Sequence, residues 1–176
     1  MDLDLSGKGH LYTDQLATIQ RLNVSRHPAK KLSQIVASPL LKSLSLTQCS
    51  IHSLDGISRI AALAELSLWY NRSLCDVADL SSHKDSIRAL SIGFCPKIAD
   101  FSFLSQFSKL ECLELVGRNS LPNLDFLRAL NSLKTFTFDR NVLDGDLSPC
   151  LNIPCVHLLQ NRKHYNLSDA DLPKDR

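Results

Sequence analysis

Apolar residues recur along this chain in a fixed pattern that returns every 20 to 24 residues. Each copy has apolar side chains at its first, fourth and sixth places, and mostly polar residues between them. Seven copies in register indicate a repeat protein, because a unit of this length buries its apolar edge only against its neighbours. The first places of the copies are Ile19, Leu41, Leu63, Ile87, Leu110, Leu133 and Ile153.

The copy that begins at Leu63 shows what each unit predicts. Leu66 and Leu68 alternate with polar residues, which is the period of a β-strand with one buried face. Asn71 then ends the strand, and its amide can satisfy backbone groups of the adjacent turn. Apolar residues follow at a spacing of three, which suits 3₁₀ or extended segments better than long α-helices. These residues are Leu74, Val77 and Leu80.

The units resemble the leucine-rich repeat family, and their spacing is similar to that of its 22-residue, internalin-like subclass. The resemblance covers residues 19 to about 162. It implies an α/β solenoid of about seven coils, with a parallel sheet on the concave side. The convex side is expected to carry 3₁₀, short helical or irregular segments. Such a motif identifies a fold and says little about activity.

We expect a single domain over residues 1–176, with a cap at each end, because the terminal units of a solenoid would otherwise expose their core. Residues 1–18 form the expected N-terminal cap, residues 19–162 the repeats, and residues 163–176 the C-terminal cap and tail. The apolar residues expected to close the ends are Leu3, Leu5, Leu11 and Leu16 in the first cap and Tyr165, Leu167 and Leu172 in the second.

Charge and hydropathy narrow the class of protein further. The net charge is +2, and no run of five like charges occurs, so neither nucleic acid nor an anionic membrane is an expected partner. The first ten residues are acidic and polar where a signal peptide would be basic and then apolar. No stretch approaches 18 consecutive apolar residues. These features predict a soluble, cytoplasmic protein.

Six cysteines are present, and their places in the repeat argue against disulfides. Cys49 and Cys95 stand at the ninth place of their units, where Asn71, Asn141 and Asn161 stand in others. At this place the side chain is expected to point inward, toward the backbone of the next coil. A small buried thiol fits there as well as an amide does. We therefore expect reduced, structural cysteines.

The sequence offers little to support catalysis. None of the six histidines lies at a recognisable spacing from a nucleophile and an acidic group, and no glycine-rich phosphate loop occurs. We therefore predict that the protein is not an enzyme and that it binds no cofactor. One cluster, Cys150, Cys155, His157 and His164, has ligands that zinc accepts. Its spacing matches no common finger, so packing is favoured over metal, and a zinc-dependent enzyme is a remote alternative.

Solenoids usually recognise partners through strand positions that face away from the core. Here these positions gather the aromatic residues at the expected centre of the concave sheet, with acidic residues beside them. Aromatic and arginine side chains dominate the binding energy of many interfaces, whereas nucleic acid would require lysine and arginine among the aromatics. The alternative is that Trp69 and Tyr70 only cover the core edge or lie exposed. The expected partner-binding residues are Trp69, Tyr70, Phe94, Glu65, Glu114, Asp139, Arg140 and His157.

These observations favour a non-enzymatic solenoid that binds another protein through its concave face. A small repeat protein without a visible effector acts by occupying a surface. It is similar to small stand-alone bacterial repeat proteins, some of which are immunity proteins that neutralise toxins. We therefore predict a specific inhibitor or immunity-type protein for a toxin or enzyme. A regulatory adaptor or scaffold subunit of a larger complex is the alternative, and no small-molecule substrate is expected.

Overall fold

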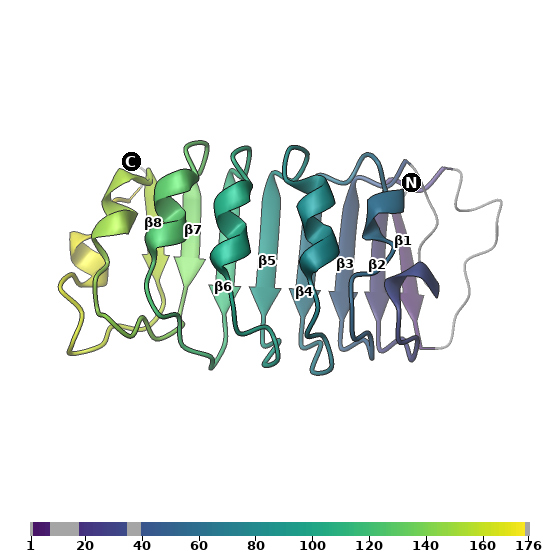
Figure 1. Cartoon of the computed structure of the whole chain (residues 1–176), viewed down its shortest axis with the longest axis horizontal. Helices are drawn as coiled ribbons and strands as arrows, with labels where there is room; N and C mark the ends of the chain where they lie inside the picture. Colours follow the sequence, from purple (N-terminus) through teal and green to yellow (C-terminus); the bar gives the residue numbers. More distant parts are fainter. Residues whose placement is uncertain (1, 8–17, 35–39, 175–176) are drawn as a thin grey trace.

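The computed structural model describes residues 2–7, 18–34 and 40–174, and it shows one sheet of eight parallel strands side by side (Figure 1). Each strand pairs with its neighbours in sequence, in the order β1 to β8. Because consecutive strands are parallel, the chain crosses back after every strand and completes one coil per repeat. The strands are β1 (Asp2–Ser6), β2 (Arg21–Ser25), β3 (Ser43–Thr47), β4 (Glu65–Trp69), β5 (Ala89–Gly93), β6 (Cys112–Val116), β7 (Thr135–Phe138) and β8 (Cys155–Leu158).

Short 3₁₀ segments form a second layer over one face of the sheet (Figure 1). The apolar spacing of three residues predicted them, and every helical segment among the described residues is of this type. No helix among those residues is long and apolar enough to cross a bilayer. The segments are η1 (Leu32–Gln34), η2 (Ile57–Arg59), η3 (Ala78–His83), η4 (Ser102–Gln106), η5 (Asp125–Ala129), η6 (Ser148–Asn152) and η7 (Asp169–Asp171).

The core lies between the sheet and the 3₁₀ layer, and its register is the predicted one. The first, fourth and sixth places of all seven units are buried. Equivalent residues of successive strands are paired, so that Leu44, Leu66 and Leu90 lie in one row. In β7 two phenylalanines replace the usual leucines. The rings of Phe136 and Phe138 are fully buried and stack with centroids 4.7 Å apart.

Both ends of the sheet are closed by the expected residues where the structure describes them. Leu3 and Leu5 lie on β1, which pairs in register with β2, and both pack partly buried against the core. Leu11 and Leu16 of the predicted first cap lie outside the described residues. At the other end, Leu172 is buried against the last coil.

Tyr165 and Leu167 also fold back on the last coil, as expected. The Tyr165 hydroxyl accepts a hydrogen bond from the backbone N–H of Val142 at 3.0 Å and donates to the Arg140 carbonyl at 3.2 Å. These bonds satisfy backbone groups of the preceding coil, so the C-terminal segment closes the stack with polar as well as apolar contacts.

The ninth place of the repeat forms an inward ladder in the middle of the stack. Asn71 is fully buried; its amide donates to the Leu46 carbonyl at 2.8 Å and accepts from the Cys49 N–H at 2.8 Å. The Cys49 thiol faces the Val24 carbonyl at 3.6 Å, and the Cys95 thiol faces the Leu68 carbonyl at 3.5 Å. Thiol and amide therefore bridge one coil to another in the same way.

The ladder does not continue beyond the fourth unit, because the ninth place of the fifth unit is Arg118, whose side chain is exposed. The Asn141 side-chain oxygen is buried without a hydrogen-bond partner among the described residues. Asn161 is exposed and accepts a hydrogen bond from the backbone N–H of Asp169 at 2.9 Å, within the C-terminal cap. All six cysteines are free thiols. Burial raises the pKa of Cys49 and Cys95, and it raises the pKa of Cys150 to about 12.

Candidate functional site

The structure brings Trp69, Tyr70 and Phe94 together in one aromatic cluster. The Tyr70 and Phe94 rings are parallel within 1° and their centroids are 4.9 Å apart. The Trp69 ring lies 6.1 Å from Tyr70 and 6.3 Å from Phe94, tilted against both. Such separations are typical of favourable aromatic pairs. The cluster lies on the two middle strands of the sheet, β4 and β5, but at their carboxyl ends and so at one edge of the concave face.

A repeated turn places two of these rings at the edge. Tyr70 and Phe94 occupy the eighth place of their units and have left-handed backbone conformations, with φ of 57° and 51°. Arg26 and Gln48, at the same place in earlier units, have φ of 53° and 56°. Non-glycine residues rarely adopt this conformation, which costs on the order of 1–3 kcal/mol. The turn thus redirects the chain at the end of the strand. As a result, the side chain at the eighth place no longer follows the alternation between the two faces of the sheet.

Hydrogen bonds from the next coil hold this turn in place. The backbone N–H of Tyr70 donates to the Gly93 carbonyl at 2.9 Å, and that of Phe94 donates to the Val116 carbonyl at 3.0 Å. Each left-handed residue is thereby fixed by the strand that follows it in the stack. The aromatic rings therefore rest on a rigid backbone.

Trp69 lies across the neighbouring strand. It pairs with Gly93 in the sheet register, and a Cβ atom added to Gly93 would lie only 2.2 Å from the indole Cε3. The indole is half-buried as a result. Trp69 thus covers part of the sheet edge, as the alternative interpretation expected, while Tyr70 remains 42% exposed.

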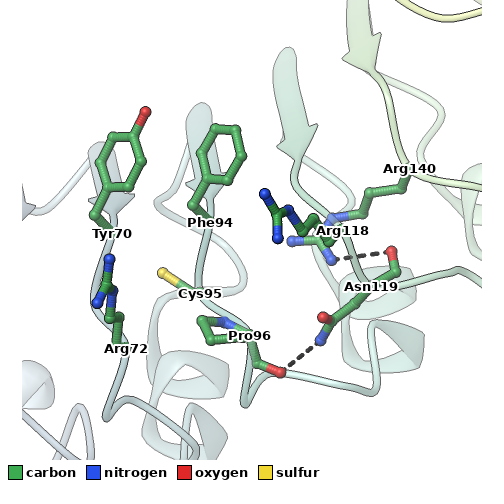
Figure 2. Close-up of a pocket in the computed structure, with 8 residues that line it drawn as sticks. All are labelled: Tyr70, Arg72, Phe94, Cys95, Pro96, Arg118, Asn119 and Arg140. Carbon is green, nitrogen blue, oxygen red and sulfur yellow. Dashed lines mark hydrogen bonds between the residues drawn. The ribbon is translucent and has the colours of Figure 1, made fainter.

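Beside the cluster is an open hollow with a volume of about 440 Å³ (Figure 2). The stacked aromatic side chains lie at one side of it, and arginine side chains from the third, fifth and sixth units project around it (Figure 2). Asn119 fixes the loop at its base, since its amide donates to the Pro96 carbonyl at 2.6 Å. The lining includes Tyr70, Arg72, Phe94, Arg118, Asn119 and Arg140.

Arg140 does not lie on the open face where the sequence placed it. Its side chain is only 1% exposed, with the guanidinium 4.7 Å above the Phe101 ring. The guanidinium donates to the Val116 carbonyl at 3.2 Å and to the Asn119 carbonyl at 3.3 Å. The physical reason is local: Arg140 stands at an eighth place but lacks the positive φ of the earlier units, so its side chain turns inward.

The charge of Arg140 is incompletely compensated. Burial lowers the pKa of its guanidinium, and the nearby Asp139 carboxylate acts in the opposite direction. Its Nε atom is buried without a hydrogen-bond partner among the described residues. Its hydrogen bonds go to neutral backbone carbonyls, and a buried cation is costly unless it is paired.

Sequence reasoning missed Arg72 and Arg118. Both side chains are exposed on the hollow, and among the described residues neither has a hydrogen bond or an ion pair. They stand at the tenth and ninth places of their units, just beyond the strand positions that face away from the core. Extending the repeat frame by two places into the turn would have found them.

The acidic residues expected beside the aromatic cluster lie elsewhere. Glu65 is at the opposite end of β4, about 13 Å along the strand from Trp69 at about 3.3 Å per residue. It faces Arg21, with its carboxylate 4.0 Å from the guanidinium. Glu114 is in the middle of β6 and accepts a hydrogen bond from the Ser91 hydroxyl at 3.0 Å.

Asp139 and His157 are also separate from the hollow. The Asp139 carboxylate accepts a hydrogen bond from the Gly117 N–H at 2.6 Å and so caps the preceding turn. His157 is exposed on β8, three strands from β5, which is about 14 Å at the usual strand spacing. The acidic neighbours that argued against nucleic acid are therefore not part of the cluster.

The possible zinc cluster at the C-terminal end does not assemble. The Cys155 thiol lies 3.3 Å from the His157 Nε2, and Cys155 is buried. His164 Nε2 instead lies 2.9 Å from the Val142 carbonyl, and Cys150 is buried in η6. Among the described residues no three His, Cys, Asp or Glu side chains are arranged to hold a metal ion.

Comparison with known proteins supports the fold. No family model and no curated protein matches the sequence. Among solved structures, the chain is similar to an internalin (inlF) from Listeria monocytogenes, with a TM-score of 0.56 and 19% sequence identity. The match covers 85% of this chain and 50% of the internalin, so this chain spans about half the length of that protein. The protein has an internalin-like leucine-rich repeat fold, as the sequence predicted.

Proposed function

We propose that this protein is a non-enzymatic binding module that recognises another protein and inhibits it. The observation that carries the proposal is the aromatic cluster of Trp69, Tyr70 and Phe94 at the ends of β4 and β5, in which Tyr70 is exposed and the other two rings are partly exposed. Tryptophan and tyrosine in such clusters commonly supply most of an interface's binding energy. The proposed contact surface comprises the cluster and the concave strands beside it.

The rigidity of the cluster supports recognition of a folded partner. Tyr70 and Phe94 are fixed by a left-handed turn whose N–H groups bond the next strand. A surface that is already ordered loses little conformational entropy on binding, so more of the contact energy appears as affinity. On the adjacent concave face, three successive strands carry a serine at the same register position: Ser45, Ser67 and Ser91. These small side chains let a partner approach the sheet closely.

The buried thiols support a structural rather than a catalytic role for the cysteines in the core. Burial raises the pKa of Cys49, Cys95 and Cys150, which disfavours the thiolate that nucleophilic chemistry requires. Free thiols in all six cysteines also fit a reducing compartment. A cytoplasmic location is accordingly part of the proposal.

Within binding proteins we favour an inhibitor of the immunity type, which neutralises a toxin or enzyme by covering its working surface. The support is the preorganised edge cluster, which suits a tight and long-lived complex. A regulatory adaptor would use the same surface to join two proteins, and it would leave the activity of the bound partner unchanged.

Affinity capture from cells of the source organism tests the proposal. The bait is the tagged protein, compared with a Tyr70→Ala/Phe94→Ala variant and with Leu151→Ala, which removes a 48% exposed side chain on η6. A partner that the double variant loses and the control retains supports the site. Stoichiometric inhibition of that partner supports the inhibitor, and unchanged partner activity favours the adaptor. Equal retention by all baits would show that another surface binds.

A further inference from the structure

We propose that the hollow beside the aromatic cluster binds a carboxylate side chain of the partner protein, held by the guanidinium groups of Arg72 and Arg118. The inference rests on the proposed function and assigns the chemistry that the partner must present. Arginine recognises carboxylates well because its planar, forked donors match the two carboxylate oxygens.

The first support is the state of the two exposed arginines. The ion pairs of the described residues use other basic residues, whereas Arg72 and Arg118 have neither an acidic partner nor a hydrogen bond among those residues. The two side chains project around the same hollow from the loops that follow β4 and β6, on either side of the loop that follows β5 (Figure 2). Their donors are therefore available to a ligand without breaking an existing contact.

The second support is Arg140 in the wall of the hollow. It is buried, its Nε lacks a partner, and its hydrogen bonds go to two backbone carbonyls rather than to a carboxylate. None of the described residues that line the hollow is acidic. A bound anion would place negative charge beside a guanidinium that has lost most of its hydration, where Coulombic attraction is stronger than in water.

The surroundings indicate what accompanies the carboxylate. A second hollow, with a volume of about 390 Å³, adjoins the first and shares Tyr70 and Arg72 with it. The two hollows therefore meet at the exposed Tyr70 side chain. An acidic side chain between the arginines would place an adjacent apolar side chain of the same partner segment against the aromatic cluster. The expected motif is Asp or Glu next to an apolar residue.

The charges on the rest of the concave face favour a protein over a nucleic acid. Arg21, a basic residue on the same face, already faces Asp2 and Glu65. Glu114 lies on β6, where a nucleic-acid backbone following the sheet would meet it. Binding of single strands requires a basic groove that follows several phosphates, and two exposed arginines beside one hollow do not provide it.

The test is selection from a displayed library of random heptapeptides on the intact protein. The same library is selected in parallel on Arg72→Gln/Arg118→Gln and on a control of equal charge change, Arg59→Gln/Lys84→Gln, whose exposed side chains lie on or beside η2 and η3. We expect wild type and control to enrich peptides with Asp or Glu next to an apolar residue. The Arg72→Gln/Arg118→Gln variant should not enrich them.

A selected peptide is then titrated against the same proteins, together with its Glu→Gln or Asp→Asn analogue. The analogue and the Arg72→Gln/Arg118→Gln variant should each weaken binding at least about tenfold, because hydrogen bonds between charged groups are lost in both. The affinity should also fall with added salt, which screens exposed charges. Enrichment of peptides without acidic residues, no enrichment on wild type, or equal affinities would overturn the inference.

Two competition experiments distinguish a carboxylate from other anions that could occupy the hollow. Inorganic phosphate and a thymidine dodecamer are each offered as competitors of the selected peptide. Weak competition by both supports a carboxylate site. Displacement of the peptide by the dodecamer, at dodecamer concentrations below the Kd of the peptide, would assign the hollow to nucleic acid. If a captured protein partner depends on Tyr70 and Phe94 but not on the two arginines, this inference fails and the proposed function stands.

Discussion

The indole of Trp69 lies directly against Gly93 on the adjacent strand, so closely that a Cβ on Gly93 would come within 2.2 Å of the ring. The absence of a side chain at Gly93 lets the indole lie across β5 and reach the Phe94 ring, 6.3 Å away. The backbone of Gly93 has no positive φ, so the requirement for glycine there is steric. The shape of the aromatic cluster therefore depends on this one pair.

Gly93→Ala should displace the Trp69 ring into solvent. Because the chain has one tryptophan, its fluorescence reports on this ring alone, and we expect emission to shift to longer wavelength. The loss of stability should be about 1 kcal/mol, at the low end of the range for overpacking, since a half-buried ring can rotate away. In a Trp69→Ala background the same change should be nearly neutral in denaturant unfolding. A full penalty there would contradict the steric account.

Asn71→Ala should destabilise the fold strongly. It leaves the Cys49 N–H and the Leu46 carbonyl buried without partners, and two such losses should cost about 2–4 kcal/mol. Asn71→Cys should recover part of the loss, because cysteine occupies the same place at Cys49 and Cys95. Asn131→Ala, at an exposed position, is the matched control and should stay within about 0.5 kcal/mol. Chemical denaturation measures all three, and similar midpoints for Asn71→Ala and Asn131→Ala would refute the ladder.

Thiol labelling should divide the six cysteines into two classes. Cys75 and Cys112 are exposed and should react with a disulfide reagent in the native protein, whereas the four buried cysteines should react only after unfolding. Cys150 has its pKa raised to about 12 by burial, so raising the pH from 7 to 9 should not expose it to reagent. Counting released chromophore before and after denaturation checks this. Six fast thiols in the native protein would contradict the buried ladder.

The C-terminal cap should loosen in acid. Asp169 accepts hydrogen bonds from Lys174 at 2.6 Å and from the Leu158 N–H at 3.0 Å, and the bond from Lys174 is the main reason that its pKa lies below the ordinary 3.8. A lowered pKa means that this stabilisation is present above pH 3.8 and is lost as pH falls through the lower folded-state value. Asp169→Asn should therefore lower Tm at pH 7 and flatten its decline below pH 4. Parallel curves for variant and wild type would rule out this contribution.

Much of the fold followed from the sequence because its physics is local and repeated. Leu66 and Leu68 alternate with polar residues, and the same alternation in every unit determined which side chains face the core. Trp69, Tyr70 and Phe94 came together because the repeat frame places equivalent positions side by side. The 3₁₀ segments followed from apolar spacing of three residues.

The details of the site could not be predicted from the alternation of apolar and polar residues, because this alternation ends where the strand ends. The left-handed turn at Tyr70 and Phe94 moves their rings from the centre of the sheet to its edge. Arg140 lacks that turn and lies inward, although its place in the repeat is the same. The arginines that line the hollow are in the turns themselves, where conformation depends on bonds from the next coil.

The central claim is that the edge cluster is the partner site, and calorimetric titration of the captured partner tests it most directly. Wild type, Tyr70→Ala/Phe94→Ala and the Leu151→Ala control are titrated under the same conditions. We expect the double variant to lose at least about 2 kcal/mol of binding free energy, or about 30-fold in Kd, while the control binds like wild type. Unchanged affinity of the double variant, with its fold intact by circular dichroism, would contradict the account.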